Sequence, residues 1–345
     1  MSRRRVLAAM TAALLFAVSG GGAAAPGGVS AAESASSTPV SITLGHVTVG
    51  ALQWPSYVAE KEGFFTQQGL NVTGVLVDTN LKAAEGLISG SLQFADGSPD
   101  PEIKANAKAN AGLLILGSAM NNPVYRLIVT PGIHNFNDLR GKKVGVSATL
   151  SMDGIWMRDV LAKHGLQPGS YELVEAGGTS TRFQALKAGA LAAAWLTQPQ
   201  DFQALSEGMH SLTLSSEAMK EIIWSAYNTK RQWAAAHKDI VIRFLKAVVL
   251  AHRWLYDPKN RDAAIQILMD NTNAGKEQVT QTYDLWIKQK ALSDHGETTA
   301  LAINNMMQAL VASHQLDAPL PLDRVWDPSY LKEAIKELGL SVPSK

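Results

Sequence analysis

The chain has 345 residues, of which 46% are apolar, and its formal charge is only +1. A chain this close to neutral lacks the electrostatic footprint that nucleic acid or an anionic membrane surface requires. It contains no cysteine, which excludes disulfides, thiol catalysis and thiolate metal sites together. Its length and apolar content are sufficient for two hydrophobic cores.

The amino terminus has the pattern of a secretory signal. Three arginines at positions 3–5 precede an apolar run from Val6 to Val18 and a small-residue region that ends at Ala31. The apolar run is too short to span a membrane. We expect residues 1–31 to be a signal peptide, exported by the Sec or the twin-arginine route, and residues 32–39 to be a disordered leader. Without the cysteine of a lipid anchor, the mature protein is expected in the periplasm.

Strand-like and helix-like segments alternate along the first two thirds of the chain. Alternating or apolar runs predict strands over Ser41–Val47, Leu70–Val77, Leu92–Asp96, Leu113–Ser118, Tyr125–Val129, Lys143–Val146, Tyr171–Val174 and Ala192–Leu196. Helical spacing, often with a glycine at the exit, predicts helices over Leu81–Ser89, Pro99–Lys108, Ser151–His164, Thr179–Ala188 and Pro199–Glu207. A further helix starts at Pro55, after the first strand. This alternation favours an α/β fold of mostly parallel sheets covered by helices.

After about Lys230 the pattern becomes helical. Apolar residues from Ile240 to Leu255 recur at helical spacing, and Gly275–Lys290 and Thr298–His314 are likewise helical. No strand is predicted in this tail.

The chain is too long for one compact sheet, so we expect two lobes. Lobe 1 comprises residues 40–121 and 227–345, and lobe 2 comprises residues 122–226. Two chain crossings, near Asn121–Tyr125 and Ser225–Lys230, would form the hinge between them.

Several motifs occur in a characteristic order. They are Pro55 followed by Ala59-Glu-Lys-Glu-Gly-Phe-Phe65, then Gly69-Leu-Asn-Val72, Gly90-Ser-Leu-Gln-Phe-Ala-Asp96, Leu139-Arg-Gly-Lys-Lys-Val-Gly-Val146 and Ala185-Leu-Lys-Ala-Gly189. Over residues 41–230 their spacing resembles the nitrate/sulfonate/taurine class of ABC-transporter substrate-binding proteins. The resemblance implies a two-lobed periplasmic-binding-protein fold (type II-like), with a hinge of two crossings and a helical tail that returns to the first lobe.

The resemblance also implies a function. Proteins of this class are soluble receptors without a cofactor, which bind a small organic anion or oxyanion such as a sulfonate, taurine or nitrate. They deliver it to a membrane permease that works with an ATPase subunit. We therefore expect a monomeric receptor rather than an enzyme.

Loops at the carboxyl ends of strands face the ligand in open α/β sheets. Polar and aromatic side chains on such loops are the candidate ligand-binding residues: Gln53, Trp54, Asp96, Ser98, Asn121, Ser147, Thr149, Ser151, Thr179, Gln198 and Trp224. We expect Trp54→Ala and Thr149→Ala each to weaken solute binding without unfolding the protein.

Alternatives remain open for several of these residues. Thr149 and Ser151 either help a helix amino terminus to hold an anion or simply cap that helix. Trp54 and Trp224 are either stacking walls or core. Arg182 either reaches a bound anion or forms a solvated salt bridge. Because no candidate loop has an arginine at its apex, neutral donors or a ligand of little charge are expected.

Signs of an enzyme are few. The eight histidines show no metal-ligand spacing, and the mature chain has neither a Gly-x-Ser-x-Gly elbow nor a dinucleotide fingerprint after a strand. A periplasmic lyase or dehydratase, or a sensor subunit, built on the same scaffold is the alternative function.

Overall fold

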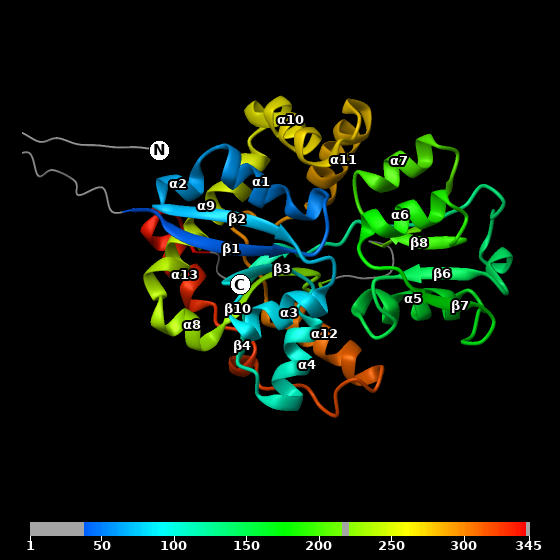
Figure 1. Ribbon diagram of the computed structural model, residues 1–345, viewed down its shortest axis with the longest axis horizontal. Coiled ribbons are helices and arrows are strands. Elements are labelled where there is room, and N and C mark those ends of the chain that lie inside the picture. Colours follow the sequence, from blue (N-terminus) through cyan, green and yellow to red (C-terminus); the bar gives the residue numbers. More distant parts are fainter. Residues whose placement is uncertain (1–37, 216–220, 343–345) are drawn as a thin grey trace, which may run out of the picture. The chain divides into compact units, whose positions relative to one another are not determined.

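The computed structural model describes residues 38–215 and 221–342. The expected signal peptide and most of the expected leader lie outside these residues. The described residues form two five-stranded sheets (Figure 1). The first sheet has the order β2 (Leu70–Leu76), β1 (Val40–His46), β3 (Phe94–Gly97), β10 (Ser225–Lys230) and β4 (Leu113–Met120). The second has the order β7 (Glu172–Glu175), β6 (Lys143–Val146), β8 (Ala193–Leu196), β5 (Arg126–Val129) and β9 (His210–Leu214).

Both sheets are mixed, whereas mostly parallel sheets were expected. In the first, β1 runs parallel to β2 and β3, and β10 runs antiparallel to β3 and β4. In the second, β6 runs parallel to β7 and β8, and β5 runs antiparallel to β8 and β9. In each sheet the antiparallel pairs involve the strand that has just entered from the other sheet, β10 or β5. The mixed pattern therefore follows from the chain crossing twice.

The predicted helices between strands are present. The helices that connect strands of the first sheet are α1 (Trp54–Lys61), α2 (Phe64–Gln67), α3 (Asn80–Ser89) and α4 (Asp100–Ala109). Those that connect strands of the second sheet are α5 (Met152–Lys163), α6 (Thr179–Lys187) and α7 (Gln200–Ser206). Short 3-10 turns at Ala51–Gln53, Phe136–Leu139, Pro258–Asn260 and Leu322–Arg324 complete the connections. The α/β fold class expected from the alternation is confirmed.

The two crossings lie side by side. The chain leaves the first sheet after Met120 and returns to it at Ser225. Ser215 joins the crossings, because its N–H donates to the Tyr125 carbonyl at 2.8 Å and its hydroxyl oxygen accepts from the Tyr125 N–H at 2.7 Å. We expected the return crossing at Ser225–Lys230, but this stretch is the buried strand β10. The lobe boundaries given above stay a prediction.

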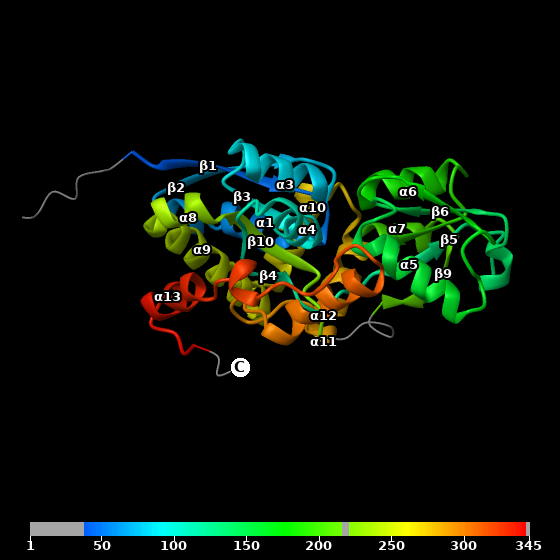
Figure 2. The ribbon, with the colours of Figure 1, turned by 90° about the horizontal axis from the view of Figure 1, so that it is seen from below.

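The tail is helical, as expected, and it packs on the first sheet (Figure 2). It comprises α8 (Arg231–Ala236), α9 (Lys238–Tyr256), α10 (Arg261–Thr272), α11 (Lys276–Gln289), α12 (Ala300–Ala312) and α13 (Ser329–Glu337). Phe244 of α9 stacks on Phe94 of β3 with ring centroids 3.9 Å apart. The tail also touches the second sheet, since the Trp286 indole N–H donates to Gln198 Oε1 at 2.9 Å. Among the described residues no strand follows β10, and no helix is long and apolar enough to cross a membrane.

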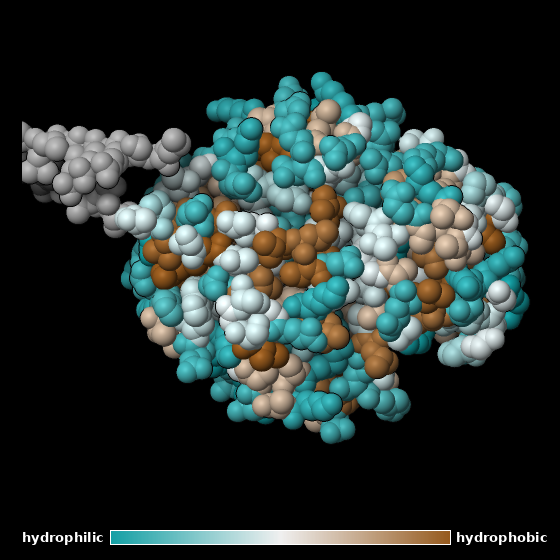
Figure 3. Space-filling model, in the orientation of Figure 1, coloured by the Kyte–Doolittle hydropathy of each residue, from teal (hydrophilic) through white to brown (hydrophobic). Residues whose placement is uncertain are grey.

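Apolar side chains remain exposed beside one edge of the first sheet. Figure 3 shows apolar surface on the face that carries β2 and α3, to which the exposed Leu76, Leu81 and Ile88 belong. Leu76 and Leu81 flank the loop of residues 77–80, which connects β2 to α3. That loop contributes to the cavity described below.

The buried His252 of α9 makes the stability of this fold sensitive to acid. Its Nδ1 lies 2.9 Å from the Ser293 carbonyl, to which the neutral ring donates, and burial lowers the pKa of His252 to about 4. An unfolded histidine binds its proton near pH 6.5, so protons are taken up on unfolding between about pH 4 and 6.5. The free energy of unfolding is therefore expected to fall as the pH falls through this range.

We expect wild type to lose up to about 3 kcal/mol more than a His252→Gln variant over that range. Urea unfolding of both proteins at pH 4.5 and pH 7 measures the difference. An equal loss of stability in the two proteins would show that His252 is not held neutral by burial.

Candidate functional site

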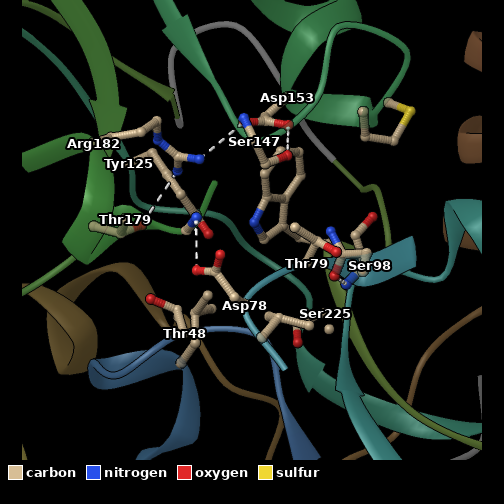
Figure 4. A pocket seen from close by; sticks show the side chains of 17 residues that line it. Thr48, Asp78, Thr79, Ser98, Tyr125, Ser147, Asp153, Thr179, Arg182 and Ser225 are labelled. Carbon is tan, nitrogen blue, oxygen red and sulfur yellow. Dashed lines mark hydrogen bonds and ion pairs between the residues drawn. The ribbon is translucent and has the colours of Figure 1, made fainter. Parts of the chain in front are cut away.

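A cavity of about 50 Å³ lies where the loops of the two sheets meet (Figure 4). The first sheet and the approach to β10 contribute Val47, Thr48, Leu52, Asp78, Thr79, Asn80, Gly97, Ser98, Trp224 and Ser225. The first crossing and the second sheet contribute Tyr125, Ser147, Met152, Asp153, Gly178, Thr179 and Arg182. One water needs about 10–15 Å³ on this measure, so the cavity has room for about three to five waters. It is suited to a small solute.

A buried ion pair forms the wall that the second sheet contributes. The Arg182 guanidinium of α6 lies 3.4 Å from Asp153 Oδ2 of α5, and both side chains are almost fully buried. Arg182 also donates to the carbonyls of Trp195 and Gly177, at 3.0 and 2.5 Å. Its remaining contact is with Thr179 Oγ1 at 3.3 Å. A salt bridge was one of the two alternatives for Arg182, but it is buried instead of solvated.

Asp153 organises the loop before α5. It accepts hydrogen bonds from the Ser147 N–H at 2.7 Å and from the hydroxyls of Ser147 and Ser151. The negative charge of Asp153 is thus compensated within the wall by Arg182 and three donors. The positive charge of Arg182 is compensated in the same way and is not left free for a solute.

The helices α3, α5 and α6 all begin at the cavity, so their amino termini lie beside it. Their unpaired N–H groups carry partial positive charge. Each end nevertheless has an oxygen partner from the protein. Thr79 Oγ1 accepts from the Lys82 N–H of α3 at 3.2 Å, Asp153 lies in the first turn of α5, and Asp78 Oδ1 lies 3.4 Å from the Gly178 N–H before α6.

Three hydroxyls at the cavity, those of Thr48, Ser98 and Ser225, have no hydrogen-bond partner among the described residues. Thr48 is 5% exposed and Ser225 is 1% exposed, and Thr48 Oγ1 and Ser225 Oγ are both unpaired. Buried polar groups in folded proteins are nearly always hydrogen-bonded. These oxygens are therefore available to form hydrogen bonds with a molecule in the cavity.

Aromatic rings close the cavity near the first crossing. The rings of Trp224 and Tyr125 are 5.1 Å apart, and Trp224 lies 4.9 Å from Trp156. Burial raises the pKa of Tyr125 to about 12, so this phenol is neutral at physiological pH. The cavity thus combines an aromatic wall with polar oxygens, which is the usual composition of a small-molecule site.

Four of the residues expected at the site line this cavity: Ser98, Ser147, Thr179 and Trp224. For Trp224, one of the two aromatics with open alternatives, the placement favours the role of a wall.

Three other expected residues lie behind the cavity. Asp96 is fully buried, pairs with His46 at 2.7 Å and accepts from the Gln53 amide at 3.1 Å. Trp54 is 1% exposed, donates to the Ala264 carbonyl at 3.0 Å and packs against Tyr283. Trp54 is therefore core, and Trp54→Ala would open a void that costs about 3–5 kcal/mol of stability.

The remaining four expected residues have partners elsewhere. The Thr149 hydroxyl donates to Glu175 at 2.8 Å, and the Ser151 hydroxyl belongs to the Asp153 network. Gln198 is fully buried and donates to the Val124 carbonyl at 2.5 Å. Asn121 donates to the Glu297 carbonyl at 2.6 Å and lines a different cavity, of about 210 Å³, between β4 and the carboxyl-terminal residues.

Several lining residues were not among the expected ones. Asp78, Thr79 and Asn80 follow the predicted strand Leu70–Val77 and precede a predicted helix, so the rule that selected the other loops applies to this one as well. Arg182 was considered from the sequence as a residue that reaches a bound anion or forms a salt bridge, but neither Arg182 nor Asp153 was assigned to the site. Thr48 and Ser225 carry no local signal, because only the tertiary fold leaves their hydroxyls unpaired.

The Arg182–Asp153 pair should be essential for the stability of the second sheet. Removal of one partner leaves an uncompensated buried charge, which typically costs about 3–5 kcal/mol. We expect Arg182→Met to lower the free energy of unfolding by that amount, and the double variant Arg182→Met/Asp153→Asn to recover part of it. A double-mutant cycle by urea unfolding measures the coupling, and additive losses would contradict a buried pair.

The fold is that of solute-binding proteins. The periplasmic nitrate-binding protein NrtA from Synechocystis PCC 6803 superposes with a TM-score of 0.74 at 16% identity, covering 89% of this chain and 92% of NrtA. The alkanesulfonate-binding protein SsuA from Xanthomonas axonopodis pv. citri, bound to MOPS, has a TM-score of 0.66 at 18% identity, covering 86% of this chain and 98% of SsuA. The two-lobed binding-protein fold expected from the motifs is confirmed.

The same fold also occurs in an enzyme. A cysteine-to-serine mutant of DSZB in complex with biphenyl-2-sulfinic acid, a structure of that desulfurization enzyme, superposes with a TM-score of 0.61 at 16% identity, covering 86% of this chain and 99% of DSZB. Fold alone does not separate receptors from enzymes here.

Sequence similarity identifies the protein family of the chain. YtlA from Bacillus subtilis (strain 168) is 22% identical over 250 residues, which are 70% of this chain and 75% of YtlA. The family described as NMT1/THI5 like matches residues 53–260, which is more than half of the chain and includes most of the cavity loops. This chain therefore belongs to the NMT1/THI5 like family.

Proposed function

We propose that this protein is the periplasmic solute-binding receptor of an ABC importer. The observation that carries the proposal is a small cavity built by loops of both sheets. Around it the two sheets are in direct contact: the Ala51 N–H donates to the Gln198 carbonyl at 2.9 Å, and the Gln200 amide donates to the Val49 carbonyl at 2.8 Å. A solute between these loops touches both sheets and favours the state in which they are closed.

The receptor would act by closure. The open form admits the solute, the lobes close about the two chain crossings between the sheets, and the closed form docks on a membrane permease. An ATPase subunit of the importer supplies the energy. The amino-terminal pattern supports export to the periplasm, and we propose that the receptor works as a monomer.

The first solutes to test are a small organic anion or oxyanion, such as a sulfonate, taurine or nitrate. This choice of solutes is supported by the structural similarity to the nitrate-binding protein NrtA and the alkanesulfonate-binding protein SsuA. The small size of the cavity supports it as well. Because the charge of Arg182 is already compensated by Asp153, hydroxyls and backbone groups are the donors we propose for the solute. Ser98, Ser147, Thr179 and Trp224 remain in the proposed site.

An enzyme on this scaffold is less well supported. Cysteine is absent from the whole sequence, and of the described residues that line the cavity none is histidine or lysine. Over the described ranges, no three histidine, aspartate or glutamate side chains are arranged to hold a metal ion. Asp78, Asp153, Tyr125 and the hydroxyls of the lining are the groups that an enzyme on this scaffold would have to use.

The unpaired hydroxyls provide a test of the site. We expect Thr48→Val and Ser225→Ala each to weaken binding of the cognate solute by about 2- to 10-fold, the worth of one neutral hydrogen bond. Neither change should lower the thermal stability of the free protein, because each removes a polar atom that has no partner in the fold. Calorimetry and thermal unfolding measure the two quantities, and Thr149→Ala, outside the cavity, is the control. Unchanged affinity in both variants would place the solute elsewhere.

Turnover separates a receptor from an enzyme. The mature protein incubated with the solute that it binds is expected to return that solute unchanged after many hours, because none of the described residues that line the cavity is cysteine, histidine or lysine. Chromatography with mass detection measures this, with heat-unfolded protein as the control. Sustained formation of product by the folded protein alone would refute the receptor assignment.

A further inference from the structure

Asp78 is held in a strained conformation at the edge of the cavity. Its φ angle is 68°, in the left-handed region that residues other than glycine rarely adopt. Both neighbours are fixed: the Val77 N–H donates to the His46 carbonyl at 2.8 Å, and Thr79 caps α3. Such strain persists only where surrounding structure imposes it, and it concentrates at functional sites.

The loop of the second sheet is shaped to approach the Asp78 carboxylate closely. A Cβ atom on Gly177 would lie 3.2 Å from Asp78 Oδ2, and one on Gly178 would lie 3.1 Å from the Val47 carbonyl. Gly177 also has a φ angle of 66°, which only glycine adopts readily. The two glycines therefore leave the space that lets this carboxylate face the opposite sheet.

The carboxylate has little to compensate its charge. Its hydrogen bond from the Gly178 N–H is long, at 3.4 Å. Within residues 38–215 and 221–342, Asp78 forms no ion pair with a lysine, arginine or histidine. This contrasts with Asp153 across the cavity, which is paired with Arg182.

The charges of the cavity wall therefore sum to one negative charge. Arg182 is the one cationic side chain among the described lining residues, and the negative charge of Asp153 compensates its positive charge. The negative charge of Asp78 therefore has no cationic counterpart in the lining. A plain anion would meet an excess of negative charge as the lobes close. A cation beside Asp78 would remove the cost of taking an unpaired carboxylate out of water.

Two of the unpaired hydroxyls, those of Thr48 and Ser225, lie in the same part of the cavity as Asp78. Figure 4 shows Thr48 and Ser225 on the side of Asp78, whereas Arg182, Asp153 and Ser147 lie on the opposite side. A hydroxyl oxygen accepts hydrogen bonds, and an ammonium group has three hydrogens to donate. Asp78, Thr48 and Ser225 can thus supply three acceptors.

From this arrangement we infer that the solute carries a protonated amine, which binds to Asp78 with the hydroxyls of Thr48 and Ser225 as further acceptors. The inference rests on the proposed receptor function, since it names the solute class of the same cavity. Asp78 is the residue that selects amines against plain oxyanions and alkanesulfonates.

Calorimetry near pH 7 with matched solutes tests this inference. Taurine and ethanesulfonate differ only in the ammonium group, ethanolamine carries the amine without a sulfonate, and nitrate carries neither. We expect wild type to bind taurine or ethanolamine at least about 30-fold more tightly than the two plain anions. In Asp78→Asn, amine binding should weaken by at least about 30-fold, the usual effect of removing one partner of a buried charge pair, and anion binding should be unchanged or tighter.

The control is Asp317→Asn, which makes the same change in net charge at an exposed position far along the chain. It should bind all four solutes as wild type does. Preference for taurine over ethanolamine identifies a zwitterion, and the reverse identifies a simple cation.

Other outcomes overturn the inference. If ethanesulfonate or nitrate binds as tightly as the amines, or if Asp78→Asn binds amines normally, Asp78 does not select the solute, while the receptor function stands. If none of the four solutes binds, the amine inference fails. The receptor function fails with it only if the broader range of solutes proposed above also gives no binding.

Discussion

The buried ion pair between Arg182 and Asp153 holds together the half of the cavity that comes from the second sheet. Each charge lies in the first turn of a different helix, Asp153 in α5 and Arg182 in α6, and each is hydrogen-bonded to groups of the loop before its own helix. Because an unpaired charge at this depth is so costly, the two loops are held in one relative arrangement. The pair also determines the charge of the cavity, since it leaves no free cation in that wall.

The half of the cavity that comes from the first sheet is stabilised by other contacts. Its loops are anchored by apolar packing on the helical tail, as in the stacking of Phe244 on Phe94, and by the Asp96 cluster behind the cavity. The tail reaches both sheets, because Trp286 of α11 donates to Gln198 after β8. Any movement of the lobes must therefore break or carry along this contact, in addition to bending the two crossings that Ser215 joins.

The expected binding residues illustrate where sequence reasoning ends. The rule that loops after strands face the ligand selected Ser98, Ser147, Thr179 and Trp224, and these four residues line the cavity. It could not exclude Trp54 or Gln198, because whether a side chain on such a loop points into the cavity depends on partners distant in sequence, Ala264 and Val124 in these cases. The strand β9 was missed although its residues from Ser211 to Leu214 alternate between polar and apolar. Residues 225–230 were taken for a crossing, whereas they form the strand β10, in which the polar residues Asn228 and Thr229 are buried.

The sequence by itself determined the α/β class, the helical tail, the order of most elements and the family resemblance. These follow from hydrophobic periodicity, glycine positions and motif spacing, all of which are local. Only the tertiary structure decided the antiparallel entry of β5 and β10, the pairing of Arg182 with Asp153 and the lack of a hydrogen-bond partner for the hydroxyls of Thr48 and Ser225 among the described residues. Hydrogen bonds and ion pairs join residues that are far apart along the chain, so the charge and polarity of the cavity exist only once both sheets have come together.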